Sequence, residues 1–242
     1  MIQNSWLNKY PIAHRGLHSN NSEIPENSII SFNKALKKNI PIEIDVQLSK
    51  DNEVIVFHDF DLLRMCSIEK KISELTLNEL KLLNLHNSKE KIPTLKETLE
   101  LINGQIPILI ELKNEGKVGD LESRVNQELI NYNGEFAIQS FNPFSLNWFR
   151  KNNSKILRGQ LTSNFEGIKM PYILKFILKK MLLNFLSKPD FISIEISSLP
   201  NSKIEKKYKN KALILGWTID NNEKQIKAKK LCDNYIFELI DI

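Results

Sequence analysis

Two carboxylates stand two residues apart in an apolar stretch, where Glu43 and Asp45 alternate with Ile42, Ile44 and Val46. Residues i and i+2 of a β-strand point to the same face, so both carboxylates project together, away from the aliphatic side chains. Two buried anions side by side repel each other and lose hydration, which is costly unless a cation neutralises them. The pair therefore predicts a site for a divalent cation with oxygen ligands, although a lone pair of this kind more often faces solvent or forms ion pairs.

A second charged pair, Glu111 and Lys113, repeats this spacing at the end of the apolar run 106–112. It would bring a third carboxylate and a cation to the same side. Lys113 taken alone is equally well explained by a salt bridge to a nearby acid. Together with Arg15, whose planar guanidinium suits two phosphate oxygens, it predicts a site for an anionic ester.

Two of the four histidines stand where predicted strands end. His14 closes the first strand, and His58 closes a strand that we expect to fold back toward Asp45. Imidazole titrates near neutral pH, so two histidines beside a carboxylate cluster predict an acid–base pair. The other two, His18 and His86, lie in polar segments and are given no role.

Short apolar, β-branched runs alternate with helical patterns along most of the chain, which predicts parallel strands joined by crossover helices. Helix-start signals occur at Thr76, Thr94 and Asp220, each three residues before a glutamate, and at Asn142 before Pro143. The length of 242 residues is close to the roughly 250 of one eightfold strand–helix barrel, so we expect an α/β TIM (β/α)8 barrel and a single domain over 1–242. The strands are expected at 10–14, 42–48, 53–58, 106–112, 134–141, 155–161, 190–196, 211–218 and 234–239.

Nine strands are one more than an eight-strand barrel contains. Only four residues, 49–52, separate the strands 42–48 and 53–58, and that link is too short for a parallel crossover. Asp51 and Asn52 suit a tight turn. We therefore expect an antiparallel β-hairpin at the barrel mouth.

The composition is that of an ordinary globular protein, with 41% hydrophobic and 26% charged residues. The net charge of +5 comes from scattered lysine pairs and predicts no nucleic-acid partner. Two distant cysteines, Cys66 and Cys232, predict neither a disulfide nor a zinc site. The first ten residues lack the apolar run of a signal peptide, and no run reaches the ~18 apolar residues of a membrane span, so we expect a cytoplasmic protein.

The segment 169–188 combines apolar residues at helical spacing with five lysines. Its simplest interpretation is a barrel helix whose apolar side packs on the strands. Because Tyr172, Phe176 and Leu183 widen the apolar arc, a weak contact with a membrane surface is a second hypothesis.

Several stretches resemble the glycerophosphodiester phosphodiesterase family in order and spacing. The family's opening strand with its HRG and PEN motifs resembles IAHRGLHSNNSEIPENSIISFNKAL, and its ExD strand, turn and final HD resemble IEIDVQLSKDNEVIVFHD. Further similar stretches are ISELTLNELKLL, IPTLKETLELI, ILIELK, IQSFNP and LGWTID. The hairpin turn departs mildly from the family, with Asp51-Asn52 in place of the usual Asp-Gly.

This resemblance implies a TIM barrel and one divalent cation, Mg2+ or Ca2+. It implies that Trp217 contacts the glycerol or alcohol part of the substrate, although a tryptophan in the core is nearly as good an interpretation. The remaining implied roles are metal ligands for Glu43, Asp45 and Glu111, acid–base catalysis for His14 and His58, and phosphate binding for Arg15 and Lys113.

The implied reaction is hydrolysis of small glycerophosphodiesters to glycerol 3-phosphate and an alcohol. In the PEN motif, Asn27 or Ser28 is expected to cap the helix 29–38, and Glu26 to orient Arg15. Two alternatives stay open: a lysophospholipase D or phosphatidylinositol phospholipase C-like activity on lipids, and a catalytically silent scaffold. The headgroup, the order of the two histidines and the oligomeric state are not readable from the sequence.

Overall fold

The structure is a computed structural model that describes residues 5–19, 23–114, 117–167, 169–201, 208 and 211–241. The chain forms two compact units. The N-terminal unit is Ile12–Phe136, and the C-terminal unit is Ala137–Ile242 together with Met1–Pro11.

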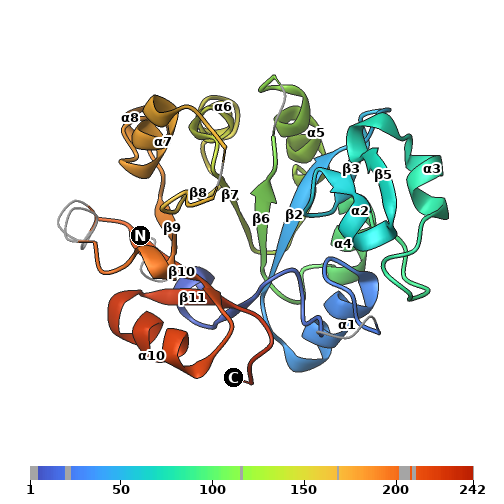
Figure 1. The fold of residues 1–242 in the computed structure, drawn as a ribbon, viewed down its shortest axis with the longest axis horizontal. Helices are drawn as coiled ribbons and strands as arrows, with labels where there is room; N and C mark the ends of the chain where they lie inside the picture. Colours follow the sequence, from blue (N-terminus) through green and yellow to red (C-terminus); the bar gives the residue numbers. More distant parts are fainter. Residues whose placement is uncertain are drawn as a thin grey trace. The chain divides into compact units, whose positions relative to one another are not determined.

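The N-terminal unit alternates strands and helices around one long strand (Figure 1). Its described strands are β1 (Ile12–Ala13), β2 (Ile42–Leu48), β3 (Val54–Val56), β4 (Asp61–Leu62), β5 (Ile68–Lys71) and β6 (Ile108–Leu112). Its described α-helices are α1 (Ile29–Lys38), α2 (Leu63–Cys66), α3 (Leu77–Leu82), α4 (Leu95–Ile102) and α5 (Asp120–Leu129).

Strand β2 pairs with three neighbouring strands. Along one edge it pairs with β6 in parallel, with Asp45 opposite Glu111. Along the other edge its first residue pairs with β1, which ends at Ala13, and its last residues pair with β3. The chain leaving β1 and the chain leaving β3 are therefore both held next to the middle of β2.

The predicted hairpin is confirmed, because β2 and β3 are antiparallel with Val46 opposite Val56. Strand β3 and the segment after it share an apolar core, which includes Ile55, Phe57 and Leu62. Phe57 is 2% exposed, so the residue directly before His58 is fixed by packing.

The described residues of the C-terminal unit form five parallel strands in the order β7-β8-β9-β10-β11. They are β7 (Phe136–Ser140), β8 (Arg158–Thr162), β9 (Phe191–Glu195), β10 (Leu213–Ile219) and β11 (Asn234–Phe237). The described helices of this unit are α6 (Pro143–Asn152), α7 (Tyr172–Lys179), α8 (Asn184–Ser187) and α10 (Asn222–Leu231). All nine predicted strands are thus present, shorter than predicted at most ends. In the described part of the chain, no helix has the length and apolarity that crossing a membrane requires.

The predicted helix starts are mostly confirmed. The side chains of Thr76, Thr94 and Asn142 each accept a backbone hydrogen bond at the start of α3, α4 and α6. The prediction for Asp220 is wrong by one residue, because Asn221 caps α10 by accepting from the Lys224 N–H. Asparagine caps as well as aspartate does, so the pattern alone does not separate two such neighbours.

The packing predicted for 169–188 is also wrong in part. The segment forms two short helices, α7 and α8, and no residue of α7 is buried. The backbone turns at Met181, which has a φ of 49°, so the two helices do not present one continuous apolar side to the strands.

Candidate functional site

The three predicted carboxylates meet in the N-terminal unit. Glu43, Asp45 and Glu111 each offer an oxygen, and these oxygens lie within 4.8 Å of one another. Glu43 and Asp45 are each 1% exposed. The parallel register of β2 and β6 explains the meeting, because it sets Glu111 directly beside Asp45 on the same face of the sheet.

Two of these buried oxygens lack hydrogen-bond donors. Neither Glu43 Oε1 nor Asp45 Oδ1 accepts a hydrogen bond from any residue that the structure describes. Buried polar atoms nearly always have a hydrogen-bond partner, so two such carboxylate oxygens in one acidic cluster fit a bound cation. Hard oxygen ligands of this kind fit Mg2+ or Ca2+.

The electrostatics of the cluster agree with its geometry. Burial raises the pKa of the Glu43 carboxyl well above its ordinary value, and the charges of Asp45 and Glu111 add to that shift. Burial also acts against ionised Asp45, but His58 when protonated, together with the charges of Lys113 and Arg15, holds the pKa of Asp45 below its usual range. Asp45 is thus the carboxylate that the surrounding cations keep charged.

Two basic side chains border the carboxylates. Arg15 donates its backbone N–H to Glu43 Oε2 at 3.1 Å, and its Nε lies 3.3 Å from Asp45 Oδ2. Lys113 Nζ lies 3.4 Å from Glu111 Oε1 and 3.7 Å from Asp45 Oδ1. Both basic residues predicted for the site, Arg15 and Lys113, therefore lie next to the carboxylate cluster.

The turn after β1 has the conformation that this arrangement requires. Arg15 and Gly16 both have positive φ, 53° and 79°. A Cβ on Gly16 would lie 2.4 Å from Ser31 Oγ, so only glycine fits there. The tight turn aims the Arg15 N–H back at β2.

The PEN motif contributes more than a helix cap. Ser28 caps α1, with its Oγ accepting from the Ser31 N–H, so Asn27 is not the cap. Asn27 instead donates from Nδ2 to Asp45 Oδ2 at 3.0 Å. Glu26 accepts from Arg15 Nη1 at 2.8 Å, as predicted.

Both predicted histidines lie at this cluster's border. His14 Nε2 is 4.0 Å from Glu43 Oε2. His58 follows Phe57, whose N–H donates to the Asp45 carbonyl at 2.9 Å. His58 Nδ1 contacts Asp59 Oδ1 at 2.6 Å.

Sequence reasoning missed the ion-pair network behind His58. Arg64, on the short helix α2, donates to both Asp59 and Glu26, with distances of 2.7 to 3.1 Å. These contacts lower the pKa of Glu26 to about 2, against the opposing effect of burial, and they also lower the pKa of Asp59. Nothing in the spacing of Arg64 signals this role.

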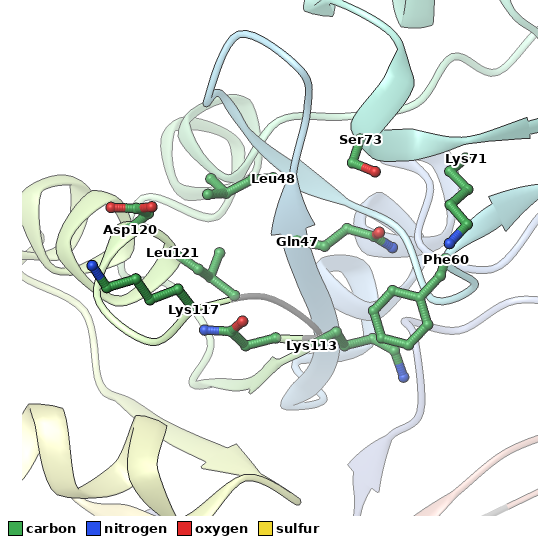
Figure 2. Close-up of a pocket in the computed structure, with 10 residues that line it drawn as sticks. Gln47, Leu48, Phe60, Lys71, Ser73, Lys113, Lys117, Asp120 and Leu121 are labelled. Atoms are coloured by element: carbon green, nitrogen blue, oxygen red, sulfur yellow. The ribbon is translucent and has the colours of Figure 1, made fainter. Parts of the chain in front are cut away.

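A cavity of about 300 Å³ opens beside Lys113. Figure 2 shows Gln47 in the middle of its lining, with Phe60 and Lys71 on one side and Lys117 on the other. Lys113 Nζ also lies 5.7 Å from the centre of the Phe60 ring. The side chain of Lys113 thus belongs both to the carboxylate cluster and to the cavity wall.

Trp217 belongs to the C-terminal unit, on β10. Its ring packs edge-on against Phe141, with centroids 5.8 Å apart, and Phe141 also contacts Phe165. The buried Trp217 Nε1 donates to none of the described residues. The predicted contact with substrate stays a prediction.

Known proteins with similar sequences include several glycerophosphodiester phosphodiesterases. The family model described as glycerophosphoryl diester phosphodiesterase matches residues 14–236. YhdW of Bacillus subtilis is 30% identical over 235 residues, which cover 92% of this chain and 90% of that protein. A glycerophosphodiester phosphodiesterase of Caldanaerobacter subterraneus is 31% identical over 232 residues, which cover 90% of this chain and 89% of the relative.

Solved structures give the same result for the fold. A phosphodiesterase of Oleispira antarctica, in complex with the product sn-glycerol-3-phosphate, superposes with a TM-score of 0.79 and 26% identity. The match covers 95% of this chain and 92% of that chain. With the strand–helix alternation observed in both units, this likeness confirms the predicted TIM (β/α)8 barrel fold.

Proposed function

Because the chain belongs to the glycerophosphoryl diester phosphodiesterase family and is a phosphodiesterase, we propose that it hydrolyses small glycerophosphodiesters by metal-dependent, histidine-assisted catalysis. The products are glycerol 3-phosphate and the free alcohol. The observation that carries the metal dependence is the meeting of three carboxylate oxygens within 4.8 Å, two of the carboxylates being buried.

The proposed metal ligands are Glu43, Asp45 and Glu111. The residues fit such an ion, since Glu43 Oε1 and Asp45 Oδ1 are buried without donors among the described residues. A bound divalent cation would supply Lewis-acid stabilisation of charge on the phosphate and lower the pKa of the attacking hydroxyl or water. We propose Mg2+ or Ca2+, because carboxylate oxygens are the ligands that both prefer.

The two histidines divide the proton transfers. Asp59 fixes a proton on His58 Nδ1 through their 2.6 Å contact, which leaves Nε2 as an acceptor. We therefore assign His58 as the general base that takes the proton of the nucleophile. His14, on the Glu43 side, then protonates the leaving alcohol.

Arg15 and Lys113 bind the phosphate in this proposal. Glu26 and Asp45 hold the Arg15 guanidinium at 2.8 and 3.3 Å, so the side chain is already ordered before a ligand arrives. Lys113 faces the 300 Å³ cavity, which offers space for one of the two alcohol parts of the diester. Trp217 is the proposed contact for the glycerol or alcohol part.

The test is turnover of glycerophosphocholine by the purified protein, with glycerol 3-phosphate and choline measured separately. We expect both products in equal amounts with Mg2+ or Ca2+ and none after treatment with EDTA. Removing one ligand in Glu111→Gln should reduce kcat by at least about a hundredfold. Glu100→Gln, which changes an exposed glutamate on α4, is the matched control and should leave kcat unchanged.

The same assay separates the alternatives. Release of choline from lysophosphatidylcholine but not from glycerophosphocholine would favour the lysophospholipase D activity. No turnover of either substrate with any divalent metal would overturn the proposed catalysis. The single catalytic domain over 1–242 and the cytoplasmic location stay predictions, the first testable by one cooperative unfolding transition and the second by cell fractionation.

A further inference from the structure

Helix α7 presents an unusual surface in the C-terminal unit. Six of its eight residues are apolar, and its two lysines, Lys175 and Lys179, lie four apart on one face, so the apolar arc is one that normally packs against a core. Yet none of its residues is buried: Tyr172 is 81% exposed, Ile173 72% and Phe176 46%. These three residues, at i, i+1 and i+4, share one face of the helix.

Helix α8 and the turn before it extend this surface. Leu182 is 48% and Phe185 68% exposed. We call Tyr172, Ile173, Leu174, Phe176, Leu182 and Phe185 the apolar patch. Six exposed aromatic and aliphatic side chains within fourteen residues exceed the scattered exposure expected of a monomer and mark an interaction site.

Other residues of the same segment pack against the rest of the C-terminal unit, so the patch is not exposed because its segment is detached. Met181, Asn184 and Ser187 point inward and are 4%, 8% and 0% exposed. Asn184 Nδ2 donates to the hydroxyl of Tyr208 at 2.9 Å. Figure 1 shows these two helices, in orange, beside α6, which packs against α8.

Five lysines accompany the patch, and none has an acidic partner among the residues that the structure describes. Lys169, Lys175, Lys179, Lys180 and Lys188 lie in the segment, and 167–189 contains no aspartate or glutamate. None of the five forms an ion pair with an acid in the described part of the chain. Apolar side chains next to uncompensated positive charge are complementary to an anionic lipid surface, with acyl chains beneath negative headgroups.

We propose that the apolar patch docks on anionic phospholipid membranes, with Tyr172, Phe176 and Phe185 inserted at the level of the headgroups. The eight residues of α7 are about 12 Å long, so the helix lies on the membrane and does not span it. A second copy of this chain is a poorer occupant, because a symmetric contact would bring two lysine-flanked patches of equal charge together.

The test is flotation of the full chain with vesicles of phosphatidylglycerol and phosphatidylcholine, against vesicles of phosphatidylcholine alone. We expect the protein to float with the anionic vesicles at low salt and to be released at high salt. Tyr172→Ser/Phe176→Ser/Phe185→Ser should weaken the partition at least about tenfold, because each substitution removes an inserted ring. Lys175→Gln/Lys179→Gln/Lys180→Gln should weaken it on anionic vesicles.

A matched control alters equally exposed apolar residues elsewhere. Leu82, Ile130 and Ile226 are 77%, 67% and 70% exposed, and changing all three to serine should leave the partition unchanged. Turnover of glycerophosphocholine and the melting temperature report folding of each variant, independently of vesicle binding. Absence of flotation at low salt, equal loss in the control variant, or a concentration-dependent dimer that the patch variant abolishes would each overturn the proposal.

Discussion

The carboxylate of Asp59 lies against the imidazole of His58, with Oδ1 2.6 Å from Nδ1. On its other side Asp59 accepts from Arg64 Nε at 2.7 Å. The carboxylate is thus fixed in place from behind while it orients the histidine, an arrangement that sets the tautomer of an imidazole and stabilises its protonated form.

The first prediction concerns this positioning residue. Asp59→Asn should lower kcat roughly tenfold to a hundredfold with little change in KM, because the neutral amide no longer stabilises imidazolium at His58. The pH–rate profile offers a readout that a merely structural role would not move. We expect the profile of Asp59→Asn to differ in shape from that of the wild type, because the negative charge that contacts His58 has been removed.

Asp61→Asn is the matched control, two residues further along the chain at the start of β4. Its Oδ1 accepts the Leu63 N–H at 3.0 Å, an interaction that asparagine retains. If Asp61→Asn and Asp59→Asn reduce kcat equally, the loss of activity comes from a local change in structure and not from the contact with His58.

The second prediction is that Glu43 destabilises the metal-free protein although it is needed for metal binding. This side chain is 1% exposed and faces two other carboxylates, so in metal-free protein its charge is both desolvated and repelled. Glu43→Gln should therefore raise the melting temperature of the EDTA-treated protein by a few degrees, on the order of 2–4 °C per kcal/mol. It should also abolish the rise in melting temperature that Mg2+ or Ca2+ causes in the wild type.

Differential scanning fluorimetry with and without metal measures both effects. Glu100→Gln should behave as the wild type in each condition. A Glu43→Gln protein that melts lower than wild type in EDTA, yet still responds to metal, would contradict the role given to this carboxylate.

The part of the site that depends on local spacing could be predicted from the sequence. Glu43 and Asp45 share a face because a strand alternates, and the four-residue link 49–52 permits only an antiparallel return. The pairing of Asp45 with Glu111 depends on which strands are neighbours, and spacing indicated only the common face. The resemblance to a family supplied the remainder of the predicted ligand set.

Other features depend on tertiary contacts that no local pattern encodes. Arg64 reaches Glu26 across 38 residues of sequence, and Asn27 contacts Asp45 because it leaves capping to Ser28. The exposure of α7 was only the second of two interpretations of its segment, since apolar helical spacing normally means burial. In each case the contact depends on which distant segment of the chain lies next to the residue in the fold.

The third prediction concerns the low pKa of Glu26. Its pKa is about 2, below its ordinary value, because Arg64 and Arg15 outweigh the opposing effect of burial. A depressed carboxyl pKa contributes stability that is present above about pH 4.5 and is lost as the pH falls through about 2. Glu26→Gln should therefore be less stable than wild type at pH 6. The difference between their free energies of unfolding should become smaller toward pH 3.

Urea denaturation at several pH values measures this difference. We expect the free energy of unfolding of Glu26→Gln to be about 1 kcal/mol below that of the wild type at pH 6. The value is modest because Arg64 is 45% exposed and solvent screens its ion pair. Glu100→Gln, which changes an exposed glutamate on α4, should differ from wild type by the same amount at both pH values. A gap that stays constant from pH 6 to pH 3 would mean that the low pKa of Glu26 is not the source of its stabilisation.

The fourth prediction has the opposite sign and concerns Glu128 in the last turn of α5. Burial, with the nearby charge of Glu53, raises the pKa of Glu128 to about 7, and its Oε2 accepts from none of the described residues. A carboxylate at a helix C-terminus also opposes the helix dipole. Because the folded-state pKa is raised, the associated stability is fully present below about pH 4.5 and is lost as the pH rises through about 7. Glu128→Gln should therefore match wild type at pH 4 and exceed it at pH 8 by roughly 1 kcal/mol, measured by urea denaturation, whereas the exposed Glu100→Gln should match wild type at both pH values.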